Sequence, residues 1–371
     1  MFRGLAAILY KETRHIMRDP KTLFLMLAIP GIELTIFGFA VNMDIQHIPT
    51  VVYNLDGRQE SRQLLDAFVN SGYFDIVGHV STDEEMYRMI VRGTARIAIK
   101  IPPDFSDKTL TAEPAQIQVL IDGSDSSSAM QALNVSNAIG LRTSVEILGR
   151  VLGIDNGMPV DVRPRVLFNP DMRTTNFMVP GLVGIILQVV IMLLTTFAIV
   201  REKEQGTLEQ LMVTPVSRLG LVLGKLVPYA IIGIAETVSV ILLMRLLFQV
   251  PIAGSLTLLA GFTMLFLVCT LGLGLLISTF TDNQIQALQF AFLVILPSVL
   301  LSGFIFPQET MPTPIYIFGQ CVPVTYFIRI LRGIILRNAG FADLWFEGAV
   351  LGGMGVTLLA LATLRFRKTL A

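Results

Sequence analysis

Six long apolar runs constrain the fold of this chain more than any other feature of its sequence. A helix needs about 20 apolar residues to cross the hydrocarbon core of a bilayer. Runs of this kind cover residues 23–42, 177–200, 226–248, 256–280, 285–306 and 348–364. The 371 residues are 53% hydrophobic and only 15% charged, which suits a membrane protein better than a soluble globule. We therefore predict an α-helical polytopic membrane protein with six transmembrane helices, five of them in the region 177–364.

The distribution of Lys and Arg predicts how these helices are oriented. With the N-terminus inside, the short inner segments carry 12 Lys and Arg residues, and the short outer loops carry three: Arg329, Arg332 and Arg337. Short cytoplasmic segments of membrane proteins are enriched in basic residues. We therefore expect both termini and residues 201–218 in the cytoplasm, with residues 365–371 forming a cytoplasmic tail. Residues 44–175 are then extracytoplasmic.

Residues 1–20 have the pattern of an amphipathic helix that lies at the membrane interface. Apolar side chains gather near one helical face, and the basic residues lie elsewhere; the apolar set is Leu5, Ile8, Leu9, Ile16 and Met17. Pro20 disfavours helical backbone at Asp19, so it separates this helix from the first span. The alternative is an ordinary soluble helix, which is the weaker interpretation because a span follows at once.

Residues 44–175 change character and predict one inserted α/β domain. Strand-like segments at 48–54, 74–80, 95–101 and 117–122 alternate with helical segments at 58–71 and 83–92, followed by a long helix at 126–152 and a return segment at 160–168. Asp122, Asp125 and the serines beside them invite a metal or nucleophile interpretation. Ser and Asp also favour turns and helix caps, and we expect a loop and a cap here.

No sequence motif for catalysis, metal binding or nucleotide binding is present. HExxH, CxxC and GxSxG do not occur, and Cys269 and Cys321 lie far apart. Gly224-Lys225 resembles the end of a phosphate-binding loop, but Leu219 and Leu226 replace the Gly and the Ser or Thr that such a loop needs. The net charge of zero gives no reason to expect a nucleic-acid partner. We expect a chain that is not an enzyme, with no catalytic residue, metal or cofactor of its own.

Two carboxylates lie near the middle of predicted spans, Glu33 in the first and Glu236 in the third. Ionisable groups at membrane depth are costly and mostly face the interior of a helix bundle or water. One interpretation is a path for a substrate or a cation, with proton exchange as a variant. The other is a hydrogen bond between helices made by a protonated carboxyl. Arg245 lies near the end of its span, where its side chain can reach the interface, and we assign it no role.

The stretch REKEQGTLEQLMVTP at 201–215 is polar and separates two spans. Thr207 with Gln210 fits a capping box, so a helix can begin there. Leu208, Leu211 and Met212 then share one apolar edge. Gly206 precedes this helix, Pro215 favours its end, and the remaining surface is acidic: Glu202, Glu204 and Glu209. The pattern predicts a short helix that can fit a groove on a soluble partner. A solvated loop is the alternative, but it explains neither the apolar edge nor the cap.

Eight short sequence segments, spread over the whole chain, resemble those of a known protein family. They are an N-terminal helix ending in RDP, REKEQGTLEQLMVTPVSR, GKLVPY, LGLGLLIST, LPSVLLSGFIFP, MPTPIY, PVTYFIRILRGIIL and RFRK. As a set they resemble the ABC-2 type permeases, the membrane subunits of ABC exporters. The likeness is greatest to the bacterial branch with one large outer domain after the first span, often associated with multidrug export.

The resemblance implies a function and a set of partners. Residues 201–215 correspond in that family to the coupling helix that sits on a separate ATP-binding subunit, where ATP is hydrolysed. A second permease subunit, identical or paralogous, pairs with the first, and a periplasmic adaptor is a further partner. The chain is then a multi-pass protein of the bacterial inner membrane that exports a hydrophobic or amphipathic, drug-like or lipid-like substrate.

Two other classes of protein remain as alternatives. A membrane-anchored sensor or assembly scaffold would use residues 44–175 to bind a ligand, but it would also need an inner signalling domain, and no inner segment is large enough. An integral-membrane enzyme would need clustered His, Asp or Glu at membrane depth, whereas only Glu33 and Glu236 are found there. Residues 324–337 form either a short helix at the outer surface or a re-entering one.

Overall fold

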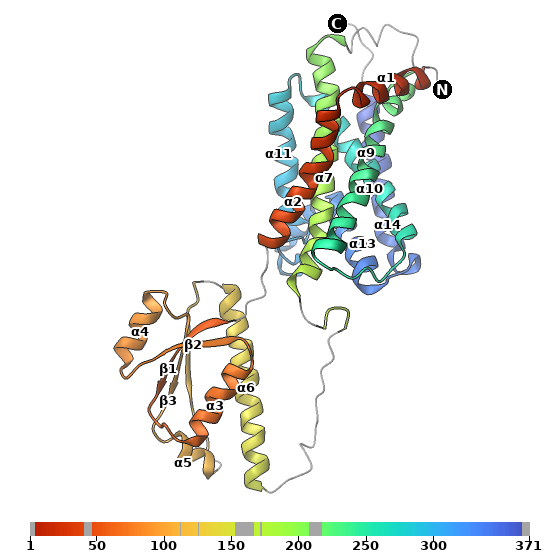
Figure 1. Cartoon of the computed structure of the whole chain (residues 1–371). Helices are drawn as coiled ribbons and strands as arrows, with labels where there is room; N and C mark the ends of the chain where they lie inside the picture. The colour runs from red at the N-terminus through yellow and green to blue at the C-terminus, as the bar shows by residue number, and fades with distance from the viewer. Residues whose placement is uncertain are drawn as a thin grey trace. The chain divides into compact units, whose positions relative to one another are not determined.

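The computed structural model describes residues 4–40, 47–111, 113–124, 126–152, 167–170, 173–207 and 217–365. The chain divides into two compact units (Figure 1). Residues Met43–Arg165 form the α/β unit, and Met1–Asn42 together with Val166–Ala371 form the helical unit. The α/β unit is therefore an insertion into the helical unit, and it ends about ten residues before the predicted boundary at 175.

A four-stranded sheet forms the centre of the α/β unit. Its strands, β1 (Ile48–Asn54), β2 (Phe74–His79), β3 (Ile97–Ile101) and β4 (Gln118–Ile121), lie in the order β2-β1-β3-β4. β1 is parallel to β2 and β3, and β4 is antiparallel to β3. The helices are α3 (Gln59–Asn70), α4 (Asp83–Val91), α5 (Phe105–Leu110) and α6 (Ser126–Leu152). The predicted strands and helices are thus confirmed within a few residues, and α5 is an addition. The return segment 160–168 lies almost wholly outside the described residues.

Successive side chains of β1 pack on opposite faces of the sheet. Ile48 and Val52 belong to a core that includes Phe68 of α3 and Ile139 of α6. Val51 belongs to a second core, with Met86 of α4 as a further member. This alternation is the pleat of a strand with both faces covered, so α3 and α6 cover one face and α4 covers the other.

In the described residues, the helical unit is built from long apolar helices and three shorter ones. Its helices are α1 (Leu5–Met17), α2 (Pro20–Ala40), α7 (Thr174–Glu204), α9 (Arg218–Leu247), α10 (Leu256–Phe280), α11 (Gln284–Leu301), α12 (Thr313–Gln320), α13 (Pro323–Arg337) and α14 (Phe341–Arg365). Pro20 begins α2, so the predicted break after α1 is confirmed. Figure 1 shows α1 lying across one end of the bundle that the other helices form. We call this the α1 end.

α7 is the central helix of the bundle. It packs against α2, α9, α10, α11 and α13, and most of its side chains from Met178 to Val200 are buried. A helix that is apolar on all sides is typical of such a central position. α10 packs closely against α14. A Cβ atom at position 348 would lie 2.3 Å from the ring of Phe262, so only glycine fits there. Gly348 and Gly355 of the last predicted span therefore serve packing within the chain, whereas Gly353 has open space beside it.

Among the described residues, five helices are long and apolar enough to cross a membrane: α7, α9 from Gly220, α10, α11 and α14. They contain five of the six predicted spans. The remaining predicted span lies in α2, whose apolar part Phe24–Ala40 is shorter. α12 and α13 form an additional pair, bent by 81°, that raises the number of candidate spans to six if it counts as one.

α13 does not lie on the surface of the helical unit. Val324, Phe327, Ile330 and Ile334 are fully buried in the main core, and the ring of Phe327 stacks on Phe266 of α10 with centroids 4.1 Å apart. Both predicted placements of residues 324–337, at the outer membrane surface or re-entering it, stay predictions, because burial within the bundle is compatible with either. The strong bend between α12 and α13 is typical of a broken or re-entrant span.

Candidate functional site

The α1 end contains the last turn of α7 and the start of the predicted inner helix. α7 does not stop where its apolar run stops at Val200 but continues to Glu204. Arg201 and Lys203 favour this extension, since cations stabilise the C-terminal end of a helix. Gly206, with φ 68°, takes the left-handed conformation that commonly follows a helix end. Glu202 and Glu204 thus belong to α7, and the prediction that they form the acidic side of the inner helix is wrong.

Residues Leu208, Glu209, Leu211, Met212 and Pro215 of the predicted coupling helix lie outside the described residues. Thr207, which precedes them, donates a hydrogen bond from its hydroxyl to the carbonyl oxygen of Glu202 (3.2 Å). The capping box that we predicted between Thr207 and Gln210 therefore remains a prediction, because Gln210 is also outside the described residues.

Four charged side chains from three helices meet at the α1 end, and we call them the ion cluster: Lys11 and Glu12 of α1, Glu202 of α7 and Lys225 of α9. The ammonium of Lys225 contacts the carboxylate of Glu12 at 3.2 Å and also pairs with Glu202. Lys11 contacts Glu202 at 2.8 Å. The side chains of Lys225 and Glu12 are only 5% and 6% exposed, so these charges are held by one another and not by water.

The electrostatics of Lys11 reflect this arrangement. Burial by itself lowers the pKa of its ammonium, but the hydrogen bond and charge of Glu202, with a further contribution from Glu12, outweigh burial and raise the pKa above its usual value. Lys11 is therefore firmly cationic at neutral pH. Two lysines and two glutamates make the ion cluster neutral as a whole, which favours its burial.

Close packing of α1 on α9 brings the ion cluster together. A Cβ at Gly224 would lie 2.8 Å from Ile8 of α1, so only glycine allows the two helices to approach this closely. The Gly224-Lys225 pair that resembles part of a phosphate-binding loop has a structural role instead. Gly224 admits α1, and Lys225 holds the carboxylates of α1 and α7.

Two further contacts attach the end of α7 to the connection between α10 and α11. Lys203 contacts the carboxylate of Asp282 at 2.5 Å and donates to the carbonyl oxygen of Thr281 at 2.9 Å. The carboxylate of Glu204 accepts hydrogen bonds from the backbone and the side chain of Gln284. The residues that lead into the segment 208–216 are thus connected to α1, α9 and α11. A cavity of about 400 Å³ opens beside the ion cluster, between α1, α7 and Gln284.

The two glutamates predicted at membrane depth lie on helices that pack against one another, Glu33 on α2 and Glu236 on α9. Glu236 is fully buried, and neither of its carboxylate oxygens has a hydrogen-bond partner among the described residues. The alternative interpretation was a hydrogen bond from a protonated Glu236 to another helix. Within the described part of the chain, the Glu236 carboxyl has no partner for such a bond. A buried, unpaired carboxyl is costly, so its presence favours a functional role.

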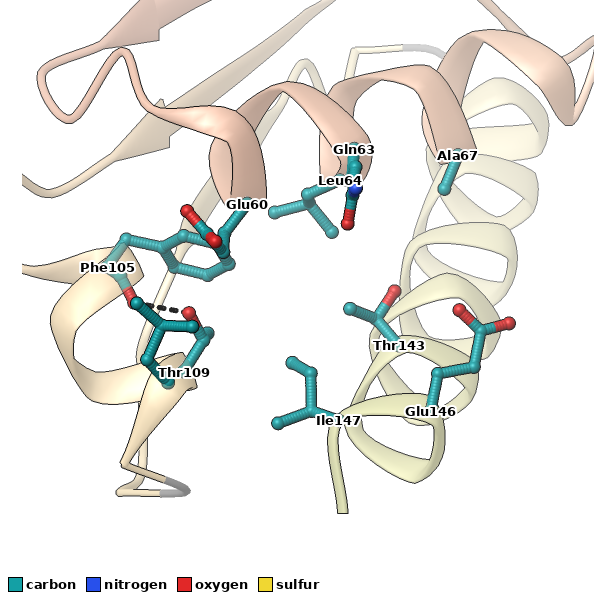
Figure 2. A pocket seen from close by; sticks show the side chains of 10 residues that line it. Glu60, Gln63, Leu64, Ala67, Phe105, Thr109, Thr143, Glu146 and Ile147 are labelled. Carbon is teal, nitrogen blue, oxygen red and sulfur yellow. Dashed lines mark hydrogen bonds between the residues drawn. The ribbon is translucent and has the colours of Figure 1, made fainter. Parts of the chain in front are cut away.

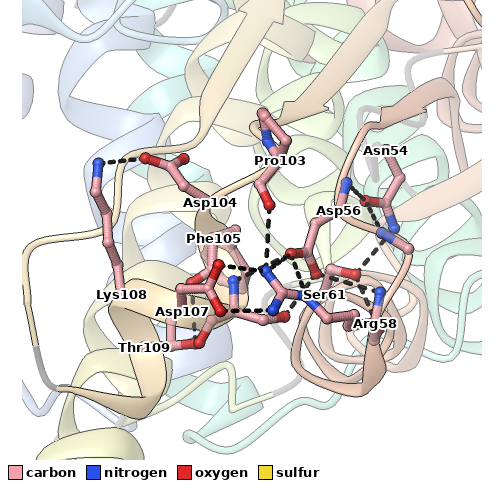
Figure 3. A network of polar contacts seen from close by, with 12 residues as sticks. Asn54, Asp56, Arg58, Ser61, Pro103, Asp104, Phe105, Asp107, Lys108 and Thr109 are labelled. Atoms are coloured by element: carbon pink, nitrogen blue, oxygen red, sulfur yellow. Dashed lines mark hydrogen bonds and ion pairs between the residues drawn. The ribbon is translucent and has the colours of Figure 1, made fainter.

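The loops that follow β1 and β3 are joined by a polar network in the α/β unit (Figure 3). Asp56 accepts hydrogen bonds from the hydroxyl of Ser106 (2.5 Å) and from Nε of Arg58 (2.9 Å). Arg58 also forms a bidentate pair with Asp107. Burial raises the pKa of Asp56, but these hydrogen bonds outweigh it and lower the pKa to about 2. The network is thus a structural clamp whose donors and acceptors satisfy one another.

Beside this network, α3, α5 and α6 enclose a cavity of about 310 Å³ (Figure 2). Leu64, Phe105 and Ile147 line it together with Glu60 and Glu146, and the carboxylate of Glu146 pairs with Arg142 at 2.9 Å. At the start of α6, Asp122 accepts a hydrogen bond from the backbone N–H of Ser124, in agreement with the predicted loop. Asp125 lies outside the described residues.

Comparison with known proteins identifies the family. The family model of the ABC-2 family transporter protein matches residues 20–364. The chain is 34% identical to the Escherichia coli protein named "Probable multidrug ABC transporter permease YbhS", over 91% of this chain and 89% of that one. It is 29% identical to the permease YbhR, over 93% of both chains, and 27% identical to the "Inner membrane transport permease YhhJ", over 97% and 96%. This chain therefore belongs to the ABC-2 family of transporter permeases.

Proposed function

We propose that this chain is the membrane-spanning permease subunit of an ATP-driven exporter in the bacterial inner membrane. A separate ATP-binding subunit docks on residues 201–215 and hydrolyses the ATP, and a second permease subunit completes the transporter. The observation that carries this proposal is the ion cluster, in which Glu202 at the end of α7 is bound to Lys11 of α1 and Lys225 of α9.

The ion cluster supplies a means of coupling. A force applied to the segment after Thr207 acts on the last turn of α7, the central helix of the bundle. The contacts of Glu202 and Glu204 pass the same force to α1, α9 and the start of α11. Because four helices are connected at this one end, docking of the ATPase moves them together and does not simply unwind one helix end.

Glu33 and Glu236 mark the substrate path in this proposal. Glu236 is fully buried in the helical bundle, and Glu33 lies on α2, which packs against α9. A hydrophobic or amphipathic substrate that carries a cationic group would provide the partner that the Glu236 carboxylate lacks within the described residues. We expect Glu236→Gln to reduce export of lipophilic cationic dyes much more than export of neutral ones, with ATPase binding unchanged. Equal loss of both dye classes would remove Glu236 from the substrate path.

Changing Leu208 and Leu211 together to Asp tests the docking. The change keeps the length of the segment but puts two charges into the predicted apolar contact. Each buried unpaired charge costs several kcal/mol, which is enough to dissociate a moderate interface. We expect normal membrane insertion, loss of ATPase co-purification and loss of transport-stimulated ATP hydrolysis. The control is Glu209→Gln, which should weaken binding only modestly, as changes of rim charges do. Undiminished co-purification of the double variant would remove residues 201–215 from the ATPase interface.

A further inference from the structure

An apolar groove runs along the helical unit between α9 and α10. It encloses about 560 Å³, within the range of roughly 300–1,000 Å³ that is typical of ligand sites. Its lining is aliphatic apart from Met264 and three polar residues, Thr237, Arg245 and Thr263. The α9 side continues into a stripe of exposed apolar side chains, with Val238, Leu242 and Leu246 each more than half exposed. In a membrane protein, such a stripe faces lipid.

Arg245 places a positive charge at one end of this groove. It lies two residues before the end of α9, opposite the α1 end of the bundle. It makes one hydrogen bond, from Nη1 to the carbonyl oxygen of Val250 at 3.3 Å, and no carboxylate pairs with it within the described ranges. A guanidinium has five N–H donors in a planar fork that suits phosphate. Most of these donors are therefore left for an anionic ligand.

Thr263 adds a second polar group inside the groove. Its residue is 3% exposed, and its hydroxyl oxygen has no hydrogen-bond partner among the residues the structure describes. The neighbouring Thr270 of α10 bonds to the carbonyl oxygen of Phe266 in the usual way for a helix, whereas Thr263 makes no such bond. An unsatisfied buried hydroxyl is costly, so a ligand that supplies an acceptor there is favoured. Thr263 lies seven residues into α10, about 10 Å along that helix from its start.

We infer that this groove binds one anionic phospholipid. Its phosphate pairs with Arg245, an ester carbonyl oxygen accepts from the hydroxyl of Thr263, and an acyl chain lies along the aliphatic lining. The order of phosphate, ester and acyl chain in the lipid matches the order of Arg245, Thr263 and the aliphatic lining from the end of α9 toward the middle of the bundle. The site is independent of ATP coupling, because none of its residues belongs to the ion cluster or the segment 201–215.

Native mass spectrometry of the full chain tests the inference. The protein is equilibrated in micelles that contain phosphatidylglycerol and phosphatidylcholine with the same acyl chains, and the retained lipids are counted. We expect wild type to retain one phosphatidylglycerol in preference, and Arg245→Gln to lose this preference by about tenfold. Ala260→Phe, which fills the groove without changing its charge, should lower retention of both lipids. Arg173→Gln, at an exposed Arg outside the groove, should behave as wild type.

Four outcomes would overturn the inference, the last of them in a separate displacement experiment. One is equal retention of the two lipids by wild type, and another is an unchanged preference in Arg245→Gln. The third is a change in the number of chains per complex in Arg245→Gln with lipid retention unaltered, which would assign the groove to a second protein chain. Addition of inorganic phosphate distinguishes a headgroup site from a free-anion site. Phosphate should not displace the lipid, and displacement by phosphate alone would also count against the proposed occupant.

Discussion

Replacing Lys225 with Met tests whether the ion cluster holds the α1 end together. Met has a similar length and a similar helix propensity, so the change removes the charge with little effect on α9 itself. It leaves Glu12, whose side chain is 6% exposed, facing Glu202, whose side chain is 15% exposed. Two carboxylates that shared a buried ammonium would then repel one another across a dry interface.

The size of the effect follows from the contacts that remain. Removing one partner of a buried ion pair typically costs about 3–5 kcal/mol. Lys11 stays in place at 2.8 Å from Glu202 and 3.7 Å from Glu12, which partly compensates both carboxylates. We therefore expect the lower value, about 3 kcal/mol. For a unit of this size, about 1 kcal/mol corresponds to about 2–4 °C, so the melting temperature should fall by roughly 6–12 °C.

Thermal unfolding in mild detergent measures this shift, with Lys203→Met as the matched control. Lys203 also pairs with a carboxylate near the end of α7, but Asp282 is 78% exposed, and exposed pairs contribute only about 0–1 kcal/mol. A second variant, Glu12→Gln together with Lys225→Met, should recover much of the loss, because it removes the repulsion. If Lys225→Met melts within about 2 °C of wild type, or no lower than Lys203→Met, the ion cluster does not carry the stability assigned to it here.

Three other predictions concern sidedness and the α/β unit. The first uses a Cys321→Ser background, which removes the exposed cysteine. A cysteine that replaces the exposed Tyr87 should react with an impermeant reagent added outside intact cells, whereas one that replaces Gln205 should not. The reverse labelling pattern would contradict the predicted orientation. Residues 43–165 expressed alone should unfold cooperatively on heating, because the unit has its own cores, and a broad transition would contradict this. Since the pKa of Asp56 is lowered from 3.8 to about 2 in the folded unit, its stabilisation is present above about pH 4 and is lost as the pH falls toward 2. Asp56→Asn should therefore lower stability at pH 7, by about 1–3 kcal/mol, and flatten the acid limb of a circular-dichroism titration.

The sequence predicts the elements of this fold better than their ends. Strand and helix periodicity located β1 and α6 to the residue, since both have regular patterns between clear turn signals. The ends of the spans were less predictable, because an apolar run shows only where a helix is compatible with lipid. α7 extends past Val200 through charged residues, and α9 begins at Arg218, eight residues before its apolar run.

The sites were predictable only where a single residue carries the signal. A Glu inside an apolar run is conspicuous by itself, which is how Glu33 and Glu236 were identified, although the packing of α2 on α9 could not be read from the sequence. Lys225 was missed as a functional residue because its partners Glu202 and Glu12 are 23 and 213 positions away. Local periodicity carries no information about contacts at that separation. The bend between α12 and α13 was left open for the same reason, since the burial of α13 depends on α7, α10 and α14.

The insertion of the α/β unit also dictates the order in which the chain can assemble. α2 and α7 pack against one another, yet about 130 residues are made between Ala40 and Thr174. At about 5–20 residues per second, a ribosome needs roughly 7–26 s for that stretch. During this time α2 has no α7 to pack on, and Lys11 has no Glu202 to bind. The α/β unit is continuous in sequence and has its own cores, so it can fold during the delay, before α7 joins α2.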